Sequence, residues 1–190
     1  MIKYLIVIMG FLNFFRCAPG TQKPSSTKSS FHGMENLSVE FIALNDNFGK
    51  DKEQVFFKNY PLTEADPTSF IALDANYGKD KNAVFYCFDR RESQTYFTTR
   101  KGSIIKLDLA DPSSFKVLQN GYGMDKNYGY YEGKSFKIKD PESFICIGPF
   151  MAKDRFQVYY EDTILEKIDG NSFELINSFY AKDHKNYYIY

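Results

Sequence analysis

The stretch Gly78-Lys79-Asp80-Lys81-Asn82-Ala83-Val84-Phe85-Tyr86 decides the fold, because versions of it recur five times along the chain. Each version has a small residue, an aspartate and, a few positions later, two aromatic residues. The aspartates are Asp51, Asp80, Asp125, Asp154 and Asp183, so the numbering advances by 29, 45, 29 and 29 from one copy to the next. Self-similarity at a fixed period predicts a tandem repeat architecture.

A second phrase, Asp66-Pro67-Thr68-Ser69-Phe70, also recurs, and we call it the linker phrase. The other versions begin at Asp111, Asp140 and Asp169, and each one precedes the next repeated aspartate by the same sequence separation. The step of 45 exceeds the others by 16, and this additional segment falls between Tyr86 and Leu107. The array begins and ends in half units, a phase that suits a closed ring and is also compatible with an open stack.

Each unit is predicted to be an antiparallel meander of about three short strands. Val-aromatic-aromatic runs suit a pleated surface, and the Phe of the linker phrase opens a second strand. Gly-Lys-Asp-Lys-Asn and Asp-Pro are typical turn chemistry, and no helical period is seen after residue 36. The predicted fold is therefore all-β, with about five 29-residue units in an open twisted stack. The alternative is a small five-bladed propeller-like ring, for which a unit of this length is short.

Composition predicts one repeat domain, residues 37–190, behind a leader. Lys plus Arg and Asp plus Glu both number 24, so the net charge is zero, which argues against nucleic acid as a partner. Aromatic residues make up 18% of the chain without any Trp, so Phe and Tyr must supply most of the core.

The N-terminus is predicted to direct export. Leu5 to Phe15 is an apolar run of the length found in secretory signals, and Cys17 follows it. Residues 1–17 are thus predicted to be a lipoprotein leader lipidated at Cys17, and residues 18–36 a flexible tether. Phe15-Arg16 stands where small residues are usual, so an uncleaved hydrophobic anchor is the alternative. Either reading places the protein at the cell envelope, membrane-anchored and facing the periplasm or the exterior.

The repeated aspartates are the obvious candidates for chemistry, yet they are predicted to cap turns. A cation or His184 follows each one, and no calcium-loop pattern occurs. Calcium binding and catalysis remain the alternatives. His32 and His184 have no metal-type or triad-type neighbours in the sequence, and the repeated serines stand in turns. We therefore predict no catalytic site, no metal site and no cofactor.

Two sets of residues are candidates for binding. Tyr86, Tyr131 and Tyr160 are equivalent, and neighbours in a strand point to opposite faces. They would form a ladder of rings for sugars or peptides if one face met solvent; the alternative is that neighbouring units cover both faces.

The additional segment, about residues 89–104, supplies the second set. It is basic and carries rings, and its candidate residues are Arg90, Arg91, Tyr96, Arg100 and Lys101. The alternative is a lengthened hairpin with a solvated tip. Because the other units lack this segment, we expect the scaffold to be independent of it.

The aspartate phrase resembles the signature of the DKNYY family of bacterial repeat proteins. Asp125-Lys126-Asn127 with Tyr130-Tyr131 and Asp183 with Lys185-Asn186-Tyr187-Tyr188 carry the resemblance best, and it covers about residues 41–190. His184 is interpreted as an insertion in the last copy. The resemblance implies export or lipoprotein leaders, which members often carry, and no catalytic residue, because the family has no assigned activity.

The sequence thus predicts an exported, lipid-anchored binding or scaffold module that is not an enzyme. Its predicted partners are the membrane, through the N-terminus, and a glycan or protein ligand. The leading alternative is a structural component of the cell envelope without a discrete ligand, and an enzyme hidden in the additional segment is the third reading. Cys146 has aliphatic equivalents and is predicted to be a small core residue, with a disulfide to Cys87 as the alternative.

Overall fold

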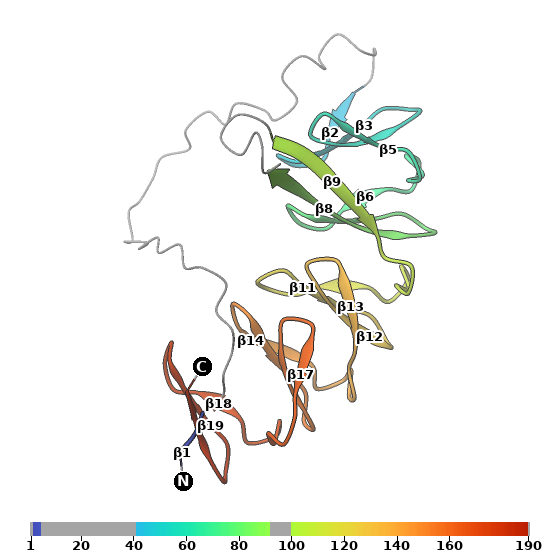
Figure 1. The fold of residues 1–190 in the computed structure, drawn as a ribbon. Helices are drawn as coiled ribbons and strands as arrows, with labels where there is room; N and C mark the ends of the chain where they lie inside the picture. The colour runs from blue at the N-terminus through green and yellow to red at the C-terminus, as the bar shows by residue number, and fades with distance from the viewer. Residues whose placement is uncertain (1, 5–40, 92–99, 190) are drawn as a thin grey trace, which may run out of the picture.

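The computed structural model describes residues 2–4, 41–91 and 100–189, and within these ranges the chain forms only strands (Figure 1). Nineteen of the twenty strands form five small antiparallel sheets, numbered here as units 1 to 5. The all-β meander fold that the repeats predict is therefore confirmed. Unit 1 contains β2 (Ile42–Ala43), β3 (Phe48–Lys50), β4 (Val55–Phe57) and β5 (Tyr60–Leu62). Unit 2 contains β6 (Ile71–Ala72), β7 (Tyr77–Lys79), β8 (Val84–Arg91) and β9 (Arg100–Lys106).

The last three units follow the same plan. Unit 3 contains β10 (Lys116–Val117), β11 (Tyr122–Met124), β12 (Tyr128–Tyr131) and β13 (Lys134–Lys137). Unit 4 contains β14 (Ile145–Gly148), β15 (Met151–Lys153), β16 (Val158–Tyr160) and β17 (Thr163–Leu165). Unit 5 contains β18 (Glu174–Leu175), β19 (Tyr180–Lys182) and β20 (Tyr187–Ile189). In unit 5 the fourth position is taken by β1 (Ile2–Tyr4), which pairs parallel with β20.

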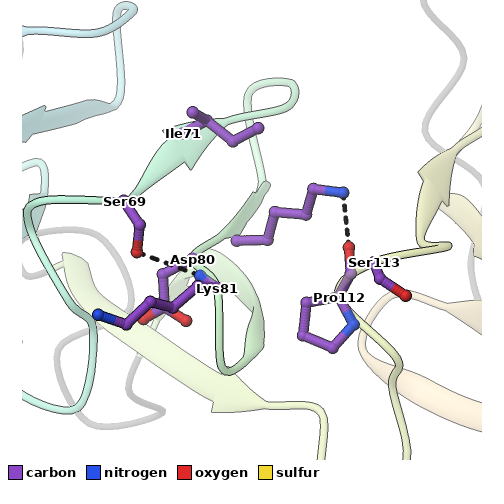
Figure 2. Close-up of a pocket in the computed structure, with 7 residues that line it drawn as sticks. Ser69, Ile71, Asp80, Lys81, Pro112 and Ser113 are labelled. Carbon is purple, nitrogen blue, oxygen red and sulfur yellow. Dashed lines mark hydrogen bonds between the residues drawn. The ribbon is translucent and has the colours of Figure 1, made fainter.

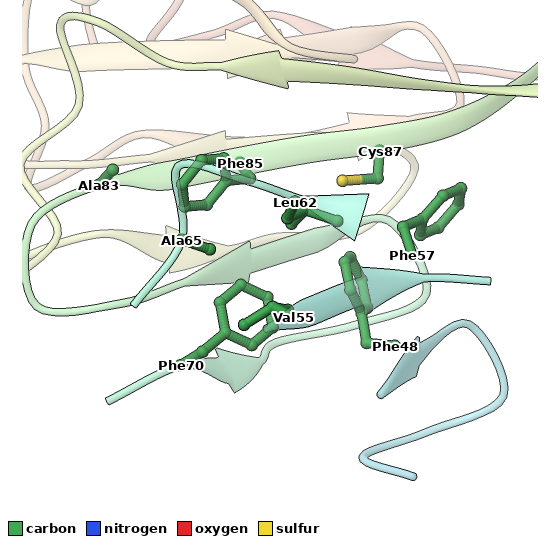
Figure 3. Packing of buried hydrophobic residues seen from close by; sticks show 9 residues of the cluster. All are labelled: Phe48, Val55, Phe57, Leu62, Ala65, Phe70, Ala83, Phe85 and Cys87. Atoms are coloured by element: carbon green, nitrogen blue, oxygen red, sulfur yellow. The ribbon is translucent and has the colours of Figure 1, made fainter. Parts of the chain in front are cut away.

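The units stack in sequence order, with unit 1 and unit 5 at opposite ends of the array (Figure 1). Four hydrophobic clusters join consecutive units, and Figure 3 shows the first of them, in which Phe48 and Leu62 of unit 1 meet Phe70 and Phe85 of unit 2. No cluster of the described residues joins unit 5 to unit 1. The predicted open stack is therefore confirmed, and the five-bladed ring is not formed.

The meanders of units 1 to 4 have four strands where three were predicted. The missed strand is the one just before the aspartate, where Gly49, Gly78 and Gly123 suggested a turn. These glycines lie in strands because the linker Phe ring packs directly over them. A Cβ on Gly78 would overlap the ring of Phe70, and a Cβ on Gly123 would overlap the ring of Phe115. Glycine in a strand marks such a close approach.

The two faces of each sheet contact different neighbours. In unit 4, Ala152 and Tyr159 point toward unit 3 and belong to the cluster shared with it. Met151 and Val158 point the other way and pack against Phe173 and other residues of unit 5. We call these the N-terminal and C-terminal faces of a unit. Alternation along the strand thus covers both faces of every inner unit.

The additional segment lengthens two strands of unit 2. The pairing of β8 with β9 continues outward to Arg91 opposite Arg100, and the tip between them lies outside the described residues. This hairpin contacts unit 1 at two places. Lys58 forms an ion pair with Asp89, and the ring of Tyr60 packs against Gly102 so closely that a Cβ there would overlap it. The segment is therefore a lengthened hairpin that contacts the neighbouring unit, and the independence of the scaffold from it stays a prediction.

Candidate binding surface

The repeated aspartates cap the turn between the second and third strands of each unit. In every copy Oδ1 accepts the backbone N–H groups two and three residues later; for Asp154 these belong to Phe156 at 2.7 Å and Gln157 at 2.8 Å. Asp51, Asp80, Asp125 and Asp183 make the same pair of bonds. The predicted structural role is confirmed.

The second carboxylate oxygen of these aspartates ties the linker to its unit. Asp154 Oδ2 accepts the N–H groups of Lys139 at 3.0 Å and Asp140 at 3.1 Å, and the Tyr159 hydroxyl donates to it at 2.7 Å. Tyr130 and Tyr188 donate to their aspartates in the same way. Burial and this bond raise the pKa of Tyr188 to about 12, so its hydroxyl remains a donor at neutral pH. The first Tyr of the repeated pair is thus a structural hydrogen-bond donor.

The residue after each aspartate pairs with the linker aspartate. Lys81 lies 2.9 Å from Asp66, Lys126 lies 2.7 Å from Asp111, and Arg155 pairs with Asp140. In unit 5 this position is His184, whose Nδ1 lies 3.0 Å from Asp169. His184 is therefore a substitution for the cation, and its interpretation as an insertion was wrong.

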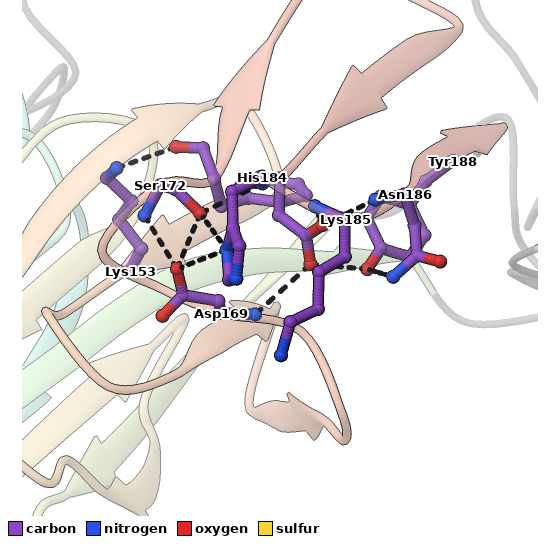
Figure 4. A network of polar contacts seen from close by, with 9 residues as sticks. Lys153, Asp169, Ser172, His184, Lys185, Asn186 and Tyr188 are labelled. Atoms are coloured by element: carbon purple, nitrogen blue, oxygen red, sulfur yellow. Dashed lines mark hydrogen bonds and ion pairs between the residues drawn. The ribbon is translucent and has the colours of Figure 1, made fainter.

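Ser172, His184 and Asp169 have the composition of a catalytic triad but not its geometry (Figure 4). Nδ1 of His184 faces both Ser172 Oγ, at 2.9 Å, and Asp169 Oδ2, and the serine hydroxyl donates to the aspartate. A triad uses one imidazole nitrogen for the serine and the other for the acid. The trio instead repeats the contacts that Ser143, Arg155 and Asp140 make in unit 4.

Polar bonds also cross between units. Lys50, Lys79 and Lys153 precede the aspartate, and each Nζ donates to a carbonyl of the next linker, as Lys79 does to Pro112 at 2.7 Å. The buried Tyr77 and Tyr122 hydroxyls donate to the next unit at Gly121 O, 2.9 Å, and Phe150 O, 2.8 Å. Each joint between units therefore combines ring packing with a few fixed hydrogen bonds.

We expect acid to weaken the array. Burial disfavours the charge on Asp183, but hydrogen bonds from Tyr188 and the turn amides outweigh it and lower its pKa from 3.8 to about 2. The Lys81 ammonium likewise lowers the pKa of Asp66. A depressed acid stabilises the fold above its unfolded pKa and loses that contribution as pH falls through its folded pKa. Denaturant unfolding should thus show stability falling between about pH 4 and pH 2. Asp183→Asn should flatten this slope, and an unchanged slope would contradict the assignment.

The predicted tyrosine ladder is not presented to solvent in the inner units. Tyr86 and Tyr131 are buried, and Tyr160 is half-buried. All three lie on the C-terminal face of their units, where the following unit covers them, as in the alternative reading. A stacking surface needs open ring faces, so these residues do not supply one as a set.

The candidate residues of the hairpin lie in two places. Arg90 and Lys101 are exposed cross-strand partners on β8 and β9. The backbones of Arg91 and Arg100 form the next pair, while Tyr96 lies outside the described residues. The structure therefore brings four basic positions together at the end of one ribbon, and their role in binding stays a prediction.

A groove of about 310 Å³ runs between the linkers of units 2 and 3 (Figure 2). It is lined by Ser69, Ile71, Lys79, Asp80, Lys81, Pro112 and Ser113. Its lysines are already engaged, Lys79 with Pro112 O and Lys81 with Asp66. The groove thus offers few polar groups that a ligand could use.

Five aromatic side chains of units 4 and 5 are exposed, and two of them, Tyr180 and Tyr187, share one surface of unit 5. Phe150 and Phe156 are about half exposed on unit 4, as are Phe179, Tyr180 and Tyr187 on unit 5. The cations of Lys139 and Arg155 lie over the Phe156 ring at 4.9 and 5.6 Å. Sequence reasoning missed this surface, although phase within the repeat holds a signal: Tyr180 and Tyr187 occupy positions that only a following unit would bury.

The cysteines sit in different joints. Cys87 is buried in the cluster of units 1 and 2, and burial raises the pKa of its thiol to about 12. Cys146 packs against the cluster of units 3 and 4, consistent with a small core residue, and both thiols are free. Among the described residues no three acidic, His or Cys side chains form a metal-type group, and no helix there is long and apolar enough to cross a membrane. Cys17 lies outside these ranges.

Comparison with known proteins gives one finding. The model of a family described as the DKNYY family matches residues 26–87 and 88–190. No curated protein and no solved structure matches the chain.

Proposed function

The chain belongs to the DKNYY family, and we propose that it is an exported, lipid-anchored module that binds a glycan or protein ligand, or scaffolds one, without catalysis. The observation that carries the proposal is the exposed pair of rings, Tyr180 and Tyr187, on one face of unit 5. Exposed apolar patches on soluble domains mark interaction sites, and here two side chains that share a face are each about half exposed.

The hydrogen bonding of the polar side chains supports a role without catalysis. The repeated aspartates, the linker serines and the first Tyr of three pairs are engaged in hydrogen bonds within the frame. No buried side-chain nitrogen or oxygen among the described residues lacks a partner. Groups that already hold a scaffold together are poorly placed to act on a substrate, whereas the Tyr180 and Tyr187 rings are exposed to solvent.

Ligand capture by the full chain tests this proposal. We expect immobilised glycans or peptides to be retained, and retention to fall either with Tyr180→Ser and Tyr187→Ser or with charge reversal of Arg90, Arg91, Arg100 and Lys101. Lys134→Glu is the matched control, because Lys134 is an exposed cation on unit 3. A correctly folded chain that captures no probe would favour the alternative, a structural component of the cell envelope without a discrete ligand.

The anchor has its own prediction. Cys17→Ser should abolish incorporation of a labelled fatty acid and release the protein from membranes, because the new N-terminal thiol is the expected acceptor. Cys146→Ser should keep both properties, since that thiol packs within the array. Absence of label from the unmodified chain, with membrane fractionation unchanged by Cys17→Ser, would remove the lipid anchor and leave an uncleaved hydrophobic segment.

A further inference from the structure

The joints between units follow one pattern. An aromatic residue on the second strand fills the C-terminal face; it is Phe48, Tyr77 or Tyr122 in units 1 to 3. The linker Phe of the next unit packs against it, with ring centroids 5.6 Å apart for Phe48 and Phe70 and 5.4 Å apart for Tyr77 and Phe115. Where the residue is Tyr, its hydroxyl also bonds a carbonyl of the next unit.

Unit 5 keeps this pattern on a face that none of the other described units covers. Tyr180 stands at the position of Tyr77 and Tyr122, and its side chain is 47% exposed where theirs are fully buried. Tyr187 stands at the position of Val158 and is 57% exposed against 0%. The register places these two side chains on one face. Tyr187 pairs with Lys182, so both point to the same face, and Lys182 shares that face with Tyr180 because the two are two residues apart in β19.

Unit 5 also keeps the lysine that inner units use to bond the next linker. Lys182 stands where Lys50, Lys79 and Lys153 donate to the next linker. In unit 5 its Nζ instead lies 2.7 Å from Glu174 of the same unit. Terminal repeats that end an array usually carry a polar outer face, whereas this face keeps the ring, the hydroxyl and the ammonium that the inner joints use.

Unit 1, at the other end of the array, carries the aromatic residues that in inner units pack against the preceding unit. Phe41 and Phe56 on the N-terminal face of unit 1 are half-buried, whereas their equivalents Phe70 and Phe85 in unit 2 are 1% exposed. Phe41 packs over Gly49 and beside Phe56, at 6.1 Å between centroids, as the linker Phe does in inner units. The ring that meets the preceding unit is therefore present in unit 1.

We infer that a second copy of this chain docks head to tail, with its unit 1 on the C-terminal face of unit 5. This inference rests on the proposed scaffold function and names its partner. The Tyr180 ring packs against Phe41 of the second copy, its hydroxyl donates to the Asn47 carbonyl, and Lys182 donates to the Phe41 carbonyl. Tyr187 is larger than the Val or Gly that inner units have at this position, so this joint is wider and holds an additional ring. The contact is heterologous, so successive copies extend the array.

Site-directed cross-linking in cells tests the geometry. Two full-length chains with different tags are co-expressed in a Cys146→Ala background, one carrying Tyr180→Cys and the other Phe41→Cys. We expect a disulfide between the two tags upon oxidation. Phe156→Cys paired with Phe41→Cys is the control, because Phe156 is 49% exposed but lies away from the end face. Equal cross-linking in both pairs would overturn the inference, and so would preferential cross-linking of two Tyr180→Cys copies, which implies a face-to-face dimer.

Sedimentation of the full chain without added cysteines gives an independent measurement. We expect concentration-dependent assembly, and Tyr180→Glu should weaken it about tenfold or more, as for an aromatic residue at the centre of an interface. Phe156→Glu should leave it unchanged. A chain that stays monomeric overturns the inference, and if it still captures a glycan or peptide the proposed binding function survives. Assembly that Tyr180→Glu does not alter would place the contact elsewhere and also overturn it.

Discussion

Replacing Phe70 by alanine is expected to lower the free energy of unfolding by roughly 3–5 kcal/mol, the range for a core phenylalanine. Phe70 is 1% exposed, and its ring contacts Phe48 of the preceding unit and Phe85 of its own. It also lies directly over Gly78. The substitution therefore leaves a cavity at a joint between two sheets, where neither backbone can move inward without disturbing the other.

Denaturant unfolding followed by circular dichroism measures this loss, and the neighbouring residue provides the control. Ile71 is 49% exposed, so Ile71→Ala should change stability by less than about 0.5 kcal/mol. The equivalent residues Phe115, Phe144 and Phe173 are also buried, and their truncation should cost a similar amount. A loss below about 1 kcal/mol for Phe70→Ala would mean that the ring does not hold the joint.

Much of the fold could be predicted because the repeat constrains every unit at once. The period set the unit length, the linker phrase set the phase, and the positions of Phe70 and its equivalents indicated the core. The aspartates were correctly assigned to turns, since a cation after each one and the absence of a calcium-loop pattern argued against a metal.

Three features could not be predicted, each for a physical reason. The strand containing Gly78 looked like a turn, because its glycine reflects a tertiary contact with Phe70 rather than local backbone preference. The role of the first Tyr in the repeated pair depends on a carboxylate oxygen that the turn leaves free, as Tyr159 and Asp154 show. The contact of the hairpin with unit 1 also escaped prediction, because Lys58 and Asp89 are far apart in the sequence and leave no local signal.

The exposed face of unit 5 could be predicted only in part from the sequence. Its residues are visible in the repeat alignment, yet only the structure shows that the second strand of each unit faces the next one. Tyr86 is covered by a neighbouring unit, whereas none of the other described units covers Tyr180. The same physics buries one ring and exposes the other, because a stack of sheets covers every face except those at its ends.

Asp154→Ala is expected to destabilise the array by at least about 3 kcal/mol, because two buried and three part-buried donors lose their acceptor together. The carboxylate accepts the N–H groups of Phe156, Gln157, Lys139 and Asp140 and the hydroxyl of Tyr159. Each buried donor left unsatisfied costs about 1–3 kcal/mol, and water entering the space can replace only part of that loss.

Asp51 is the matched control, because it makes the two turn bonds to Glu53 and Gln54 while Phe56, which has no hydroxyl, stands where Tyr159 does. Asp51→Ala should therefore cost only about 1 kcal/mol. Tyr159→Phe should cost about 1–2 kcal/mol, since it removes the bond to Asp154 and the longer bonds with Lys139 and Gln157, at a position where unit 2 already has Phe85. Equal losses for Asp154→Ala and Asp51→Ala would show that the aspartate acts only within its turn. A larger loss for Asp154→Ala would establish that one side chain holds turn, linker and ring together, which explains why the signature couples an aspartate to a tyrosine at a fixed spacing.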